Sequence, residues 1–286
     1  MQYTTLGKTN LRVSRAAFGG IIDMNETEED AKRFVAYAIE NGVNYFDVAP
    51  SYGNAEERLG PALMLYRKDV NLACKTGKRD AKGAKEELLS SLKTLRTDHF
   101  DVYQLHSMTT QEDIDLAFGP GGAMETFLWA KKEGLIRNIG FSAHSEDIAL
   151  KLLDLYDYDS VLFPMNWSMG VNAGWGDRIS EKVKQTGAGL LAMKTLILRT
   201  WREGEERIYP KSWCRPIHED DALAIAAMKY GIYKGADTLI PPGNIHHFRL
   251  MLKYIDRVAS EPLTDEEWIL LRERAEQVKD ELIFNV

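Results

Sequence analysis

Short apolar runs alternate with longer amphipathic stretches along most of the chain. The apolar runs, such as VNYF, VNLA, FDVYQL and GLLAM, show little strict alternation of polar and apolar positions. This pattern is typical of parallel strands that are covered on both faces. The runs recur about every 30 residues, which is the length of one βα unit. We expect eight strands, which end at Gly19, Asp47, Lys75, His106, Ser142, Asn166, Lys194 and Pro241.

The amphipathic stretches carry the signals of helix ends. Thr27, followed by three acidic residues, is typical of a helix start, and Gly42 is typical of a helix stop. Thr264 and Glu267 form the pattern of a second capping box near the C-terminus. The apolar stripes on these helices indicate core packing only. Eight alternating strands and helices predict the α/β class and a (β/α)8 TIM barrel with an extra C-terminal helix.

Three segments lie outside the repeat. Residues 1–14 predict an N-terminal β-hairpin that turns at 7–10 and plugs the bottom of the barrel. The connections 107–122 and 195–219 are too long for simple linkers and follow strand ends, so they are candidates for lids or binding loops. The chain has 286 residues, which fits one barrel, and we expect a single domain over residues 1–286.

Composition narrows the class of protein. With 36 basic and 43 acidic residues, the net charge of −7 gives no sign of a nucleic-acid-binding surface. No apolar run approaches the length of a membrane span, and the N-terminus does not resemble a signal peptide. The chain has two cysteines, which are too few for a disulfide scaffold; we expect Cys74 in the core and Cys214 as an exposed thiol. A cytoplasmic protein is therefore expected.

Four side chains that have no apolar use are expected at one end of the barrel. Asp47, Lys75 and His106 end consecutive strands, and Tyr52 follows Asp47 by five residues. Each residue alone would suggest packing or solvation. Because neighbouring strands lie about 4.8 Å apart, the four side chains can converge at one mouth.

This group suits proton donation to a carbonyl oxygen. A free phenol has a pKa of about 10 and is a poor acid at neutral pH. Lys75 would lower the pKa of Tyr52, Asp47 would hold Lys75, and His106 would orient the carbonyl. No side chain can supply hydride, so a nicotinamide cofactor is implied. The six histidines show no metal-binding spacing, and we expect no catalytic metal.

At these residues the sequence resembles the aldo-keto reductase family. Residues 46–60 (FDVAPSYGNAEERLG) are similar to the family signature D-T-A-x-x-Y-G-x-S-E-x-x-L-G. Residues 18–20 (FGG), 73–76 (ACKT), 103–106 (YQLH) and 132–142 (KEGLIRNIGFS) resemble further family motifs. The resemblance implies a TIM barrel that reduces aldehydes and ketones with NADPH. By resemblance, Tyr52 is the general acid, Lys75 and Asp47 tune it, and His106 orients the substrate.

The resemblance also implies a set of cofactor-binding residues: Gly20, Ser142, Asn166, Met193, Lys194, Leu196, Pro242, Gly243 and Asn244. The chain departs from the family at the nicotinamide end, where Ala143 and Leu162 stand in place of the usual Asn and Gln and Met193 in place of an aromatic ring. At the adenine end, Pro242, Gly243 and Phe248 replace the usual Lys, Ser and Arg, although His246, His247 or Arg249 could compensate. We therefore expect NADP, with NAD as an alternative.

Two other functions stay open. Lys75 could form a Schiff base in an aldolase-like lyase. The chain could also be a non-catalytic or regulatory nucleotide-binding member of the same fold.

The expected partner is a small-molecule carbonyl substrate, with no nucleic acid and no membrane. An aromatic wall is expected from four tryptophans in or beside the mouth loops: Trp167, Trp175, Trp201 and Trp213. The sequence indicates neither the substrate nor the oligomeric state.

Overall fold

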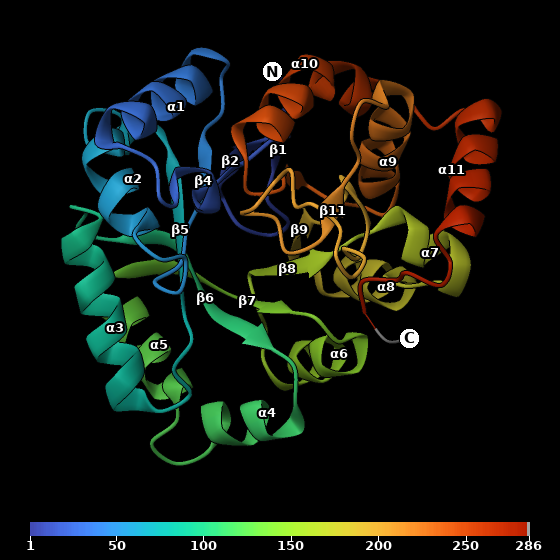
Figure 1. Cartoon of the computed structure of the whole chain (residues 1–286). Helices are drawn as coiled ribbons and strands as arrows, with labels where there is room; N and C mark the ends of the chain where they lie inside the picture. The colour runs from blue at the N-terminus through green and yellow to red at the C-terminus, as the bar shows by residue number, and fades with distance from the viewer. Residues whose placement is uncertain (285–286) are drawn as a thin grey trace.

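A computed structural model describes residues 1–284 of the chain. Eight parallel strands form one sheet, and the helices surround it (Figure 1). The strands are β3 (Phe18–Gly19), β4 (Tyr45–Asp47), β5 (Asn71–Thr76), β6 (Phe100–Met108), β7 (Ile136–Ala143), β8 (Ser160–Pro164), β9 (Gly189–Met193) and β12 (Thr238–Ile240).

The sheet closes into a barrel. The strands are ordered β12-β9-β8-β7-β6-β5-β4-β3, and a parallel bridge from Ala16 to Leu239 joins the first strand to the last. The predicted TIM barrel is confirmed. The predicted strand ends at Gly19 and Asp47 are exact, whereas β5 and β6 run one and two residues further than expected.

The predicted N-terminal hairpin, β1 (Tyr3–Thr5) with β2 (Arg12–Ser14), closes the bottom of the barrel. Its Leu6 and Val13 are fully buried and pack against barrel residues, among them Tyr45 and Leu191. Gly7 turns between the two strands with φ of +46°, and a Cβ there would lie 2.1 Å from the backbone nitrogen of Gly189. Only glycine permits this close approach to β9.

The helices begin where the sequence predicted caps. Thr27 accepts a hydrogen bond from the Asp30 amide, and Thr264 forms a capping box with Glu267. The helix that begins at Thr264 is the predicted extra C-terminal helix, and it packs on α7 and α9. The helices are α1 (Glu28–Glu40), α2 (Ala55–Leu63), α3 (Ala81–Thr94), α4 (Gln111–Phe118), α5 (Ala123–Lys132), α6 (Glu146–Leu155), α7 (Trp167–Ala173), α8 (Asp177–Thr186), α9 (Asp221–Tyr233), α10 (Ile245–Ser260) and α11 (Asp265–Gln277), with the short 3-10 helices η1 (Gly20–Asp23) and η2 (Arg67–Asp69).

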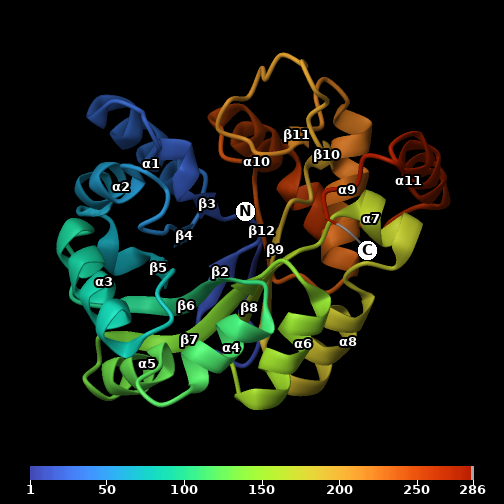
Figure 2. The same cartoon turned by 60° about the horizontal axis from the view of Figure 1, so that its bottom comes forward.

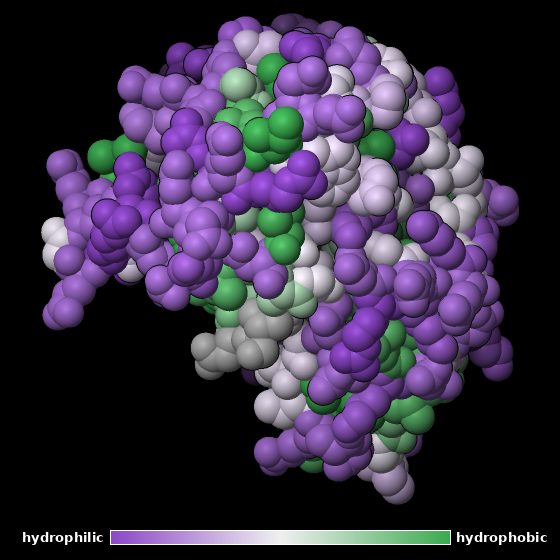
Figure 3. All heavy atoms as spheres, turned by 90° about the vertical axis from the view of Figure 1, so that its right-hand side faces the viewer, coloured by the Kyte–Doolittle hydropathy of each residue, from purple (hydrophilic) through white to green (hydrophobic). Residues whose placement is uncertain are grey.

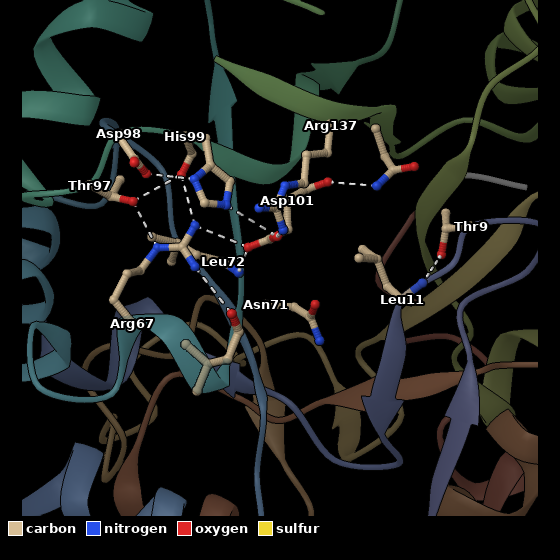
Figure 4. A network of polar contacts seen from close by, with 12 residues as sticks. Thr9, Leu11, Arg67, Asn71, Leu72, Thr97, Asp98, His99, Asp101 and Arg137 are labelled. Carbon is tan, nitrogen blue, oxygen red and sulfur yellow. Dashed lines mark hydrogen bonds and ion pairs between the residues drawn. The ribbon is translucent and has the colours of Figure 1, made fainter. Parts of the chain in front are cut away.

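A buried carboxylate ties three strands together at the end of the barrel where they begin (Figure 4). Asp101 at the start of β6 accepts a hydrogen bond from the Leu72 amide of β5 at 2.9 Å. It also pairs with Arg67 at 3.0 Å and with Arg137 of β7 at 2.8 Å. This network fixes the strands at the end of the barrel where they begin. Lys75 and His106 lie at the opposite end, which is free to carry a site.

Neither long connection is a plain loop. Residues 107–122 contain α4, and residues 195–219 contain the antiparallel pair β10 (Ile197–Arg199) and β11 (Arg215–Pro216). Figure 2 shows the second connection, in orange, passing beside α10 and β12. Lys211 ties it across the barrel mouth to η1, because its ammonium group donates to the Ile22 carbonyl at 2.7 Å and pairs with Glu26.

The surface formed by α7, α9 and α11 is mainly hydrophilic, with hydrophobic residues in small separate groups (Figure 3). Within residues 1–284, no helix is both long enough and apolar enough to cross a membrane.

Candidate active site

Lys75 lies at the centre of the predicted site and is fully buried. Its ammonium group contacts Oδ1 of Asp47, which ends the neighbouring strand, and donates to the Val48 carbonyl at 3.2 Å. Burial alone would lower the pKa of Lys75, but the charge of Asp47 and the phenol of Tyr52 outweigh burial and raise it. Lys75 is therefore a permanent buried cation at neutral pH.

Tyr52 lies against this cation, as predicted. The loop after β4 turns back through a hydrogen bond from the Tyr52 amide to the Ala49 carbonyl. The Lys75 nitrogen is 5.3 Å from the centroid of the Tyr52 ring, and the ring of His106 meets the Tyr52 ring edge-on at 5.6 Å. Burial raises the pKa of Tyr52 above 10, and Lys75 only opposes that rise, while Asp47 adds to it. The predicted net lowering of the Tyr52 pKa is therefore wrong.

His106 is a neutral side chain at the same mouth. Burial, followed by the nearby charge of Lys75, lowers its pKa to about 3. Its Nδ1 lies 3.3 Å from the Ser51 hydroxyl. A hydroxyl that donates to Nδ1 leaves the other ring nitrogen as an N–H donor. The pairing of β6 with β7 is interrupted just here, between Leu105 and Met108.

An open cavity at the barrel mouth joins these residues to other strand ends. Tyr52, Asp47 and His106 line one part of it. The rest of the wall consists of Ile21, Ser142, His144, Leu162, Met193, Lys194, Ile197, the segment 211–214, Ile240, Pro241, Pro242 and Gly243.

Five of the predicted cofactor-binding residues line this cavity: Ser142, Met193, Lys194, Pro242 and Gly243. The other four, Gly20, Asn166, Leu196 and Asn244, do not belong to the wall. The amide nitrogen of Asn166 donates to the Lys194 and Ile197 carbonyls at 3.1 and 2.8 Å. Its amide oxygen accepts from the Ser168 hydroxyl at 2.7 Å and from the Met169 amide at 3.2 Å. The Asn166 side chain is therefore occupied by its own chain.

The remaining three residues of this set contribute to packing or to a helix cap. Leu196 is fully buried in the core, and Asn244 caps α10 by accepting from the His247 amide at 2.9 Å. A Cβ on Gly20 would lie 2.8 Å from Val48, so this glycine allows the chain to pack closely against β4.

Sequence reasoning missed His144 as a site residue. Its Nδ1 is buried without a hydrogen-bond partner among the described residues, and its ring lies 5.3 Å from the ring of Phe284. Burial, then Lys194, lowers the pKa of His144 to about 4, so the ring is neutral at pH 7. Its position two residues after Ser142, at the end of a strand, was the available signal.

The aromatic wall is smaller than predicted. Trp213 lines the cavity, whereas Trp167 and Trp175 are buried in the core and Trp201 donates to the Ser212 carbonyl at 2.9 Å. The prediction of an exposed Cys214 is wrong, because this residue is only 9% exposed and lies in the cavity wall. Cys74 is buried as expected. Among residues 1–284, no group of three or more metal-ligating side chains is present.

Comparison with known sequences identifies the family. The model of the Aldo/keto reductase family matches residues 18–232. The Bacillus subtilis protein called uncharacterized oxidoreductase YqkF is 34% identical over 157 residues, which are 50% of this chain and 49% of that protein. L-galactose dehydrogenase of Arabidopsis thaliana is 27% identical over 219 residues, 69% of this chain and 66% of that protein. The matches thus span 49% and 66% of the length of these two curated relatives.

Comparison with solved structures shows the same fold. The holo form of an aldo-keto reductase from Bacillus halodurans has a TM-score of 0.71 at 24% identity. The similarity covers 97% of this chain and 96% of that one.

Proposed function

The chain belongs to the aldo/keto reductase family of oxidoreductases, and on that premise we propose that it reduces aldehyde or ketone carbonyls to alcohols with NADPH or NADH. We further propose that residues 1–286 form one such domain. The observation that carries the proposal is the arrangement of Tyr52, His106 and the buried pair of Lys75 and Asp47 at one cavity.

Family members use nicotinamide cofactors, and the cavity wall suits part of such a molecule. The Ser142 hydroxyl and the unpartnered Nδ1 of His144 offer polar contacts to a carboxamide, and Leu162, Met193 and Ile240 offer apolar surface to a ring. The bound cofactor would supply the hydride. We favour NADP as the cofactor by family resemblance and keep NAD as the alternative. Positions 242, 243 and 248 carry Pro, Gly and Phe, so these positions offer no charge to a 2′-phosphate.

Tyr52 donates the proton in this proposal. Its phenol must give up a proton as negative charge develops on the carbonyl oxygen. The ammonium group of Lys75 stabilises the resulting phenolate, and Asp47 keeps Lys75 charged and in place. A ligand that fills the cavity removes water and strengthens this interaction, because the local dielectric constant falls.

His106 positions the carbonyl. Its neutral ring can donate a hydrogen bond from the nitrogen that does not face Ser51, without placing a second cation beside Lys75. A charged imidazolium there would be repelled by Lys75, which contributes to the low pKa of His106.

The Schiff-base alternative is disfavoured by the charge on Lys75. A lysine nucleophile must lose its proton, and nearby cations or an apolar pocket without a counter-ion lower its pKa for that purpose. Here Asp47 does the opposite and raises the pKa of Lys75.

The regulatory alternative is favoured only by Asn166. Its amide makes four hydrogen bonds within the chain and is not available for a nicotinamide carboxamide.

The test is the oxidation of NADPH, and separately of NADH, with a panel of aldehydes and ketones, for the native protein and Tyr52→Phe. We expect turnover by the native protein and a loss of at least about a hundredfold in Tyr52→Phe, since general acids contribute about 10² to 10⁴ in rate. Cofactor affinity, measured by fluorescence, should be the same in both. Tight cofactor binding without turnover of any carbonyl would support the regulatory function, and trapping of a substrate on Lys75 by borohydride would support the lyase.

A further inference from the structure

Lys194 places a second cation in the cavity wall. It follows the last residue of β9 and takes a left-handed backbone conformation with φ of +65°. Its ammonium nitrogen lies 5.9 Å from the centroid of the Trp213 ring and 5.7 Å from that of the Phe284 ring. The neutral His144, whose Nδ1 lacks a partner among the described residues, is close enough for Lys194 to lower its pKa.

The surroundings of Lys194 differ from those of the buried lysines Lys75 and Lys229 and of Lys211 at the barrel mouth. Lys75 pairs with Asp47, Lys211 with Glu26, and Lys229 with Glu267 at 2.9 Å. Within residues 1–284, no carboxylate oxygen lies within 4.0 Å of the Lys194 nitrogen, and the nitrogen makes no hydrogen bond to that part of the chain. Burial lowers the pKa of Lys194, as expected for a cation without a counter-ion.

A largely buried ammonium group without a counter-ion is unfavourable unless a ligand supplies the opposite charge. Partial removal of a charge from water is costly, and the faces of two aromatic rings offset that cost only in part. The other charged groups in the wall cannot serve as partners, because Asp47 is held by Lys75 and Lys211 is itself a cation. A negatively charged ligand group would neutralise Lys194 and could accept a hydrogen bond from His144.

We propose that Lys194 and His144 form a subsite for an anionic group of a ligand that binds in this cavity. The group is a carboxylate carried by the carbonyl substrate or a phosphate of the dinucleotide. This inference rests on the proposed reductase function only for the identity of the ligand, since the charge and the cavity are properties of the chain itself.

The experiment compares the native protein with Lys194→Met and Lys194→Arg. Methionine keeps most of the length and apolar volume of the side chain but removes the charge, and arginine restores the charge. One measurement is the Kd of NADPH and NADH by fluorescence quenching without substrate. The other is KM for two matched aldehydes, benzaldehyde and 4-carboxybenzaldehyde. Lys82→Met is the control, because it removes one positive charge from a side chain that is 87% exposed.

The two sources of the anion give different results. If the substrate carries it, Lys194→Met raises KM for 4-carboxybenzaldehyde about 10- to 100-fold more than KM for benzaldehyde, as for loss of a charged hydrogen bond, and this ratio exceeds any change in the cofactor Kd. If the cofactor carries it, the Kd of both nucleotides rises by a similar factor and the two aldehydes are affected equally. Either result supports the subsite, and Lys194→Arg should recover most of the loss.

The subsite is overturned if Lys194→Met, folded with a native melting temperature, changes neither the cofactor Kd nor the ratio of the two KM values by more than Lys82→Met does. Failure of the reductase function is a separate outcome. In that case the native protein reduces neither aldehyde, while the cofactor Kd still reports whether Lys194 binds a phosphate.

Discussion

Removal of the Lys75 charge is the sharpest test of the proposed proton transfer. The Lys75 nitrogen lies 5.3 Å from the centroid of the Tyr52 ring. With an effective dielectric constant of about 20, a unit cation and a unit anion at that distance attract by about 3 kcal/mol. That energy is available only once Tyr52 carries negative charge, so its loss should lower kcat by roughly a hundredfold.

The single variant Lys75→Met cannot isolate this effect, because it leaves Asp47 buried without its partner. Breaking a buried ion pair from one side costs about 3–5 kcal/mol of stability. The double variant Lys75→Met with Asp47→Asn removes both charges and should recover most of that stability. We expect the double variant to remain about a hundredfold slow all the same, since a neutral pair does not stabilise a phenolate.

The assay is the rate of NADPH oxidation at saturating carbonyl substrate, together with urea unfolding and the cofactor Kd. Lys75→Arg is the control that keeps a positive charge. The reasoning is refuted if the double variant, with native cofactor affinity, has a kcat within about threefold of the native value, which corresponds to less than 1 kcal/mol.

Three further outcomes are expected from the fold. Gly7→Ala should lower the free energy of unfolding by at least about 3 kcal/mol, because its Cβ meets the backbone of Gly189 at positive φ; a urea-unfolding loss below 1 kcal/mol would contradict this. Asn166→Ala should cost about 2–4 kcal/mol in the same measurement, since it leaves buried backbone groups without partners, and an unchanged urea midpoint would count against that. Burial lowers the pKa of His247 to about 4, so the unfolded chain takes up the proton first as the pH falls below 6.5. The native protein therefore loses stability as the pH falls from about 6.5 to 4. Between pH 7 and pH 5, the free energy of unfolding of His247→Gln should fall by about 2 kcal/mol less than that of the native protein. Equal decreases in the two proteins would exclude this role for His247.

The positions of Tyr52, the proposed proton donor, and of its neighbours were predictable because they depend on local sequence. Asp47, Lys75 and His106 each end, or nearly end, an apolar run, and parallel strands bring such ends to one mouth. The turn at Gly7 and the cap at Thr264 are likewise properties of a few consecutive residues.

The pKa of Tyr52 and the exposure of Cys214 were not predictable, because both depend on burial in the tertiary structure. Lys75 does oppose the rise in the pKa of Tyr52, but the desolvation of the phenol is the larger effect. Cys214 looked exposed as part of a long polar connection, yet that connection is tied across the barrel mouth by Lys211 and encloses the thiol.

The sequence by itself determined the barrel, its closing hairpin, and the four residues gathered at its mouth, because hydrophobic periodicity and strand ends are encoded locally. Only the tertiary structure decided which polar groups remain available. Asn166 is occupied by the carbonyls of Lys194 and Ile197, whereas His144 and the Lys194 ammonium have no partner within residues 1–284. The hydrogen-bond partners and counter-ions of a side chain come from segments that are distant along the chain. No local sequence pattern therefore specifies whether a given polar side chain finds such partners.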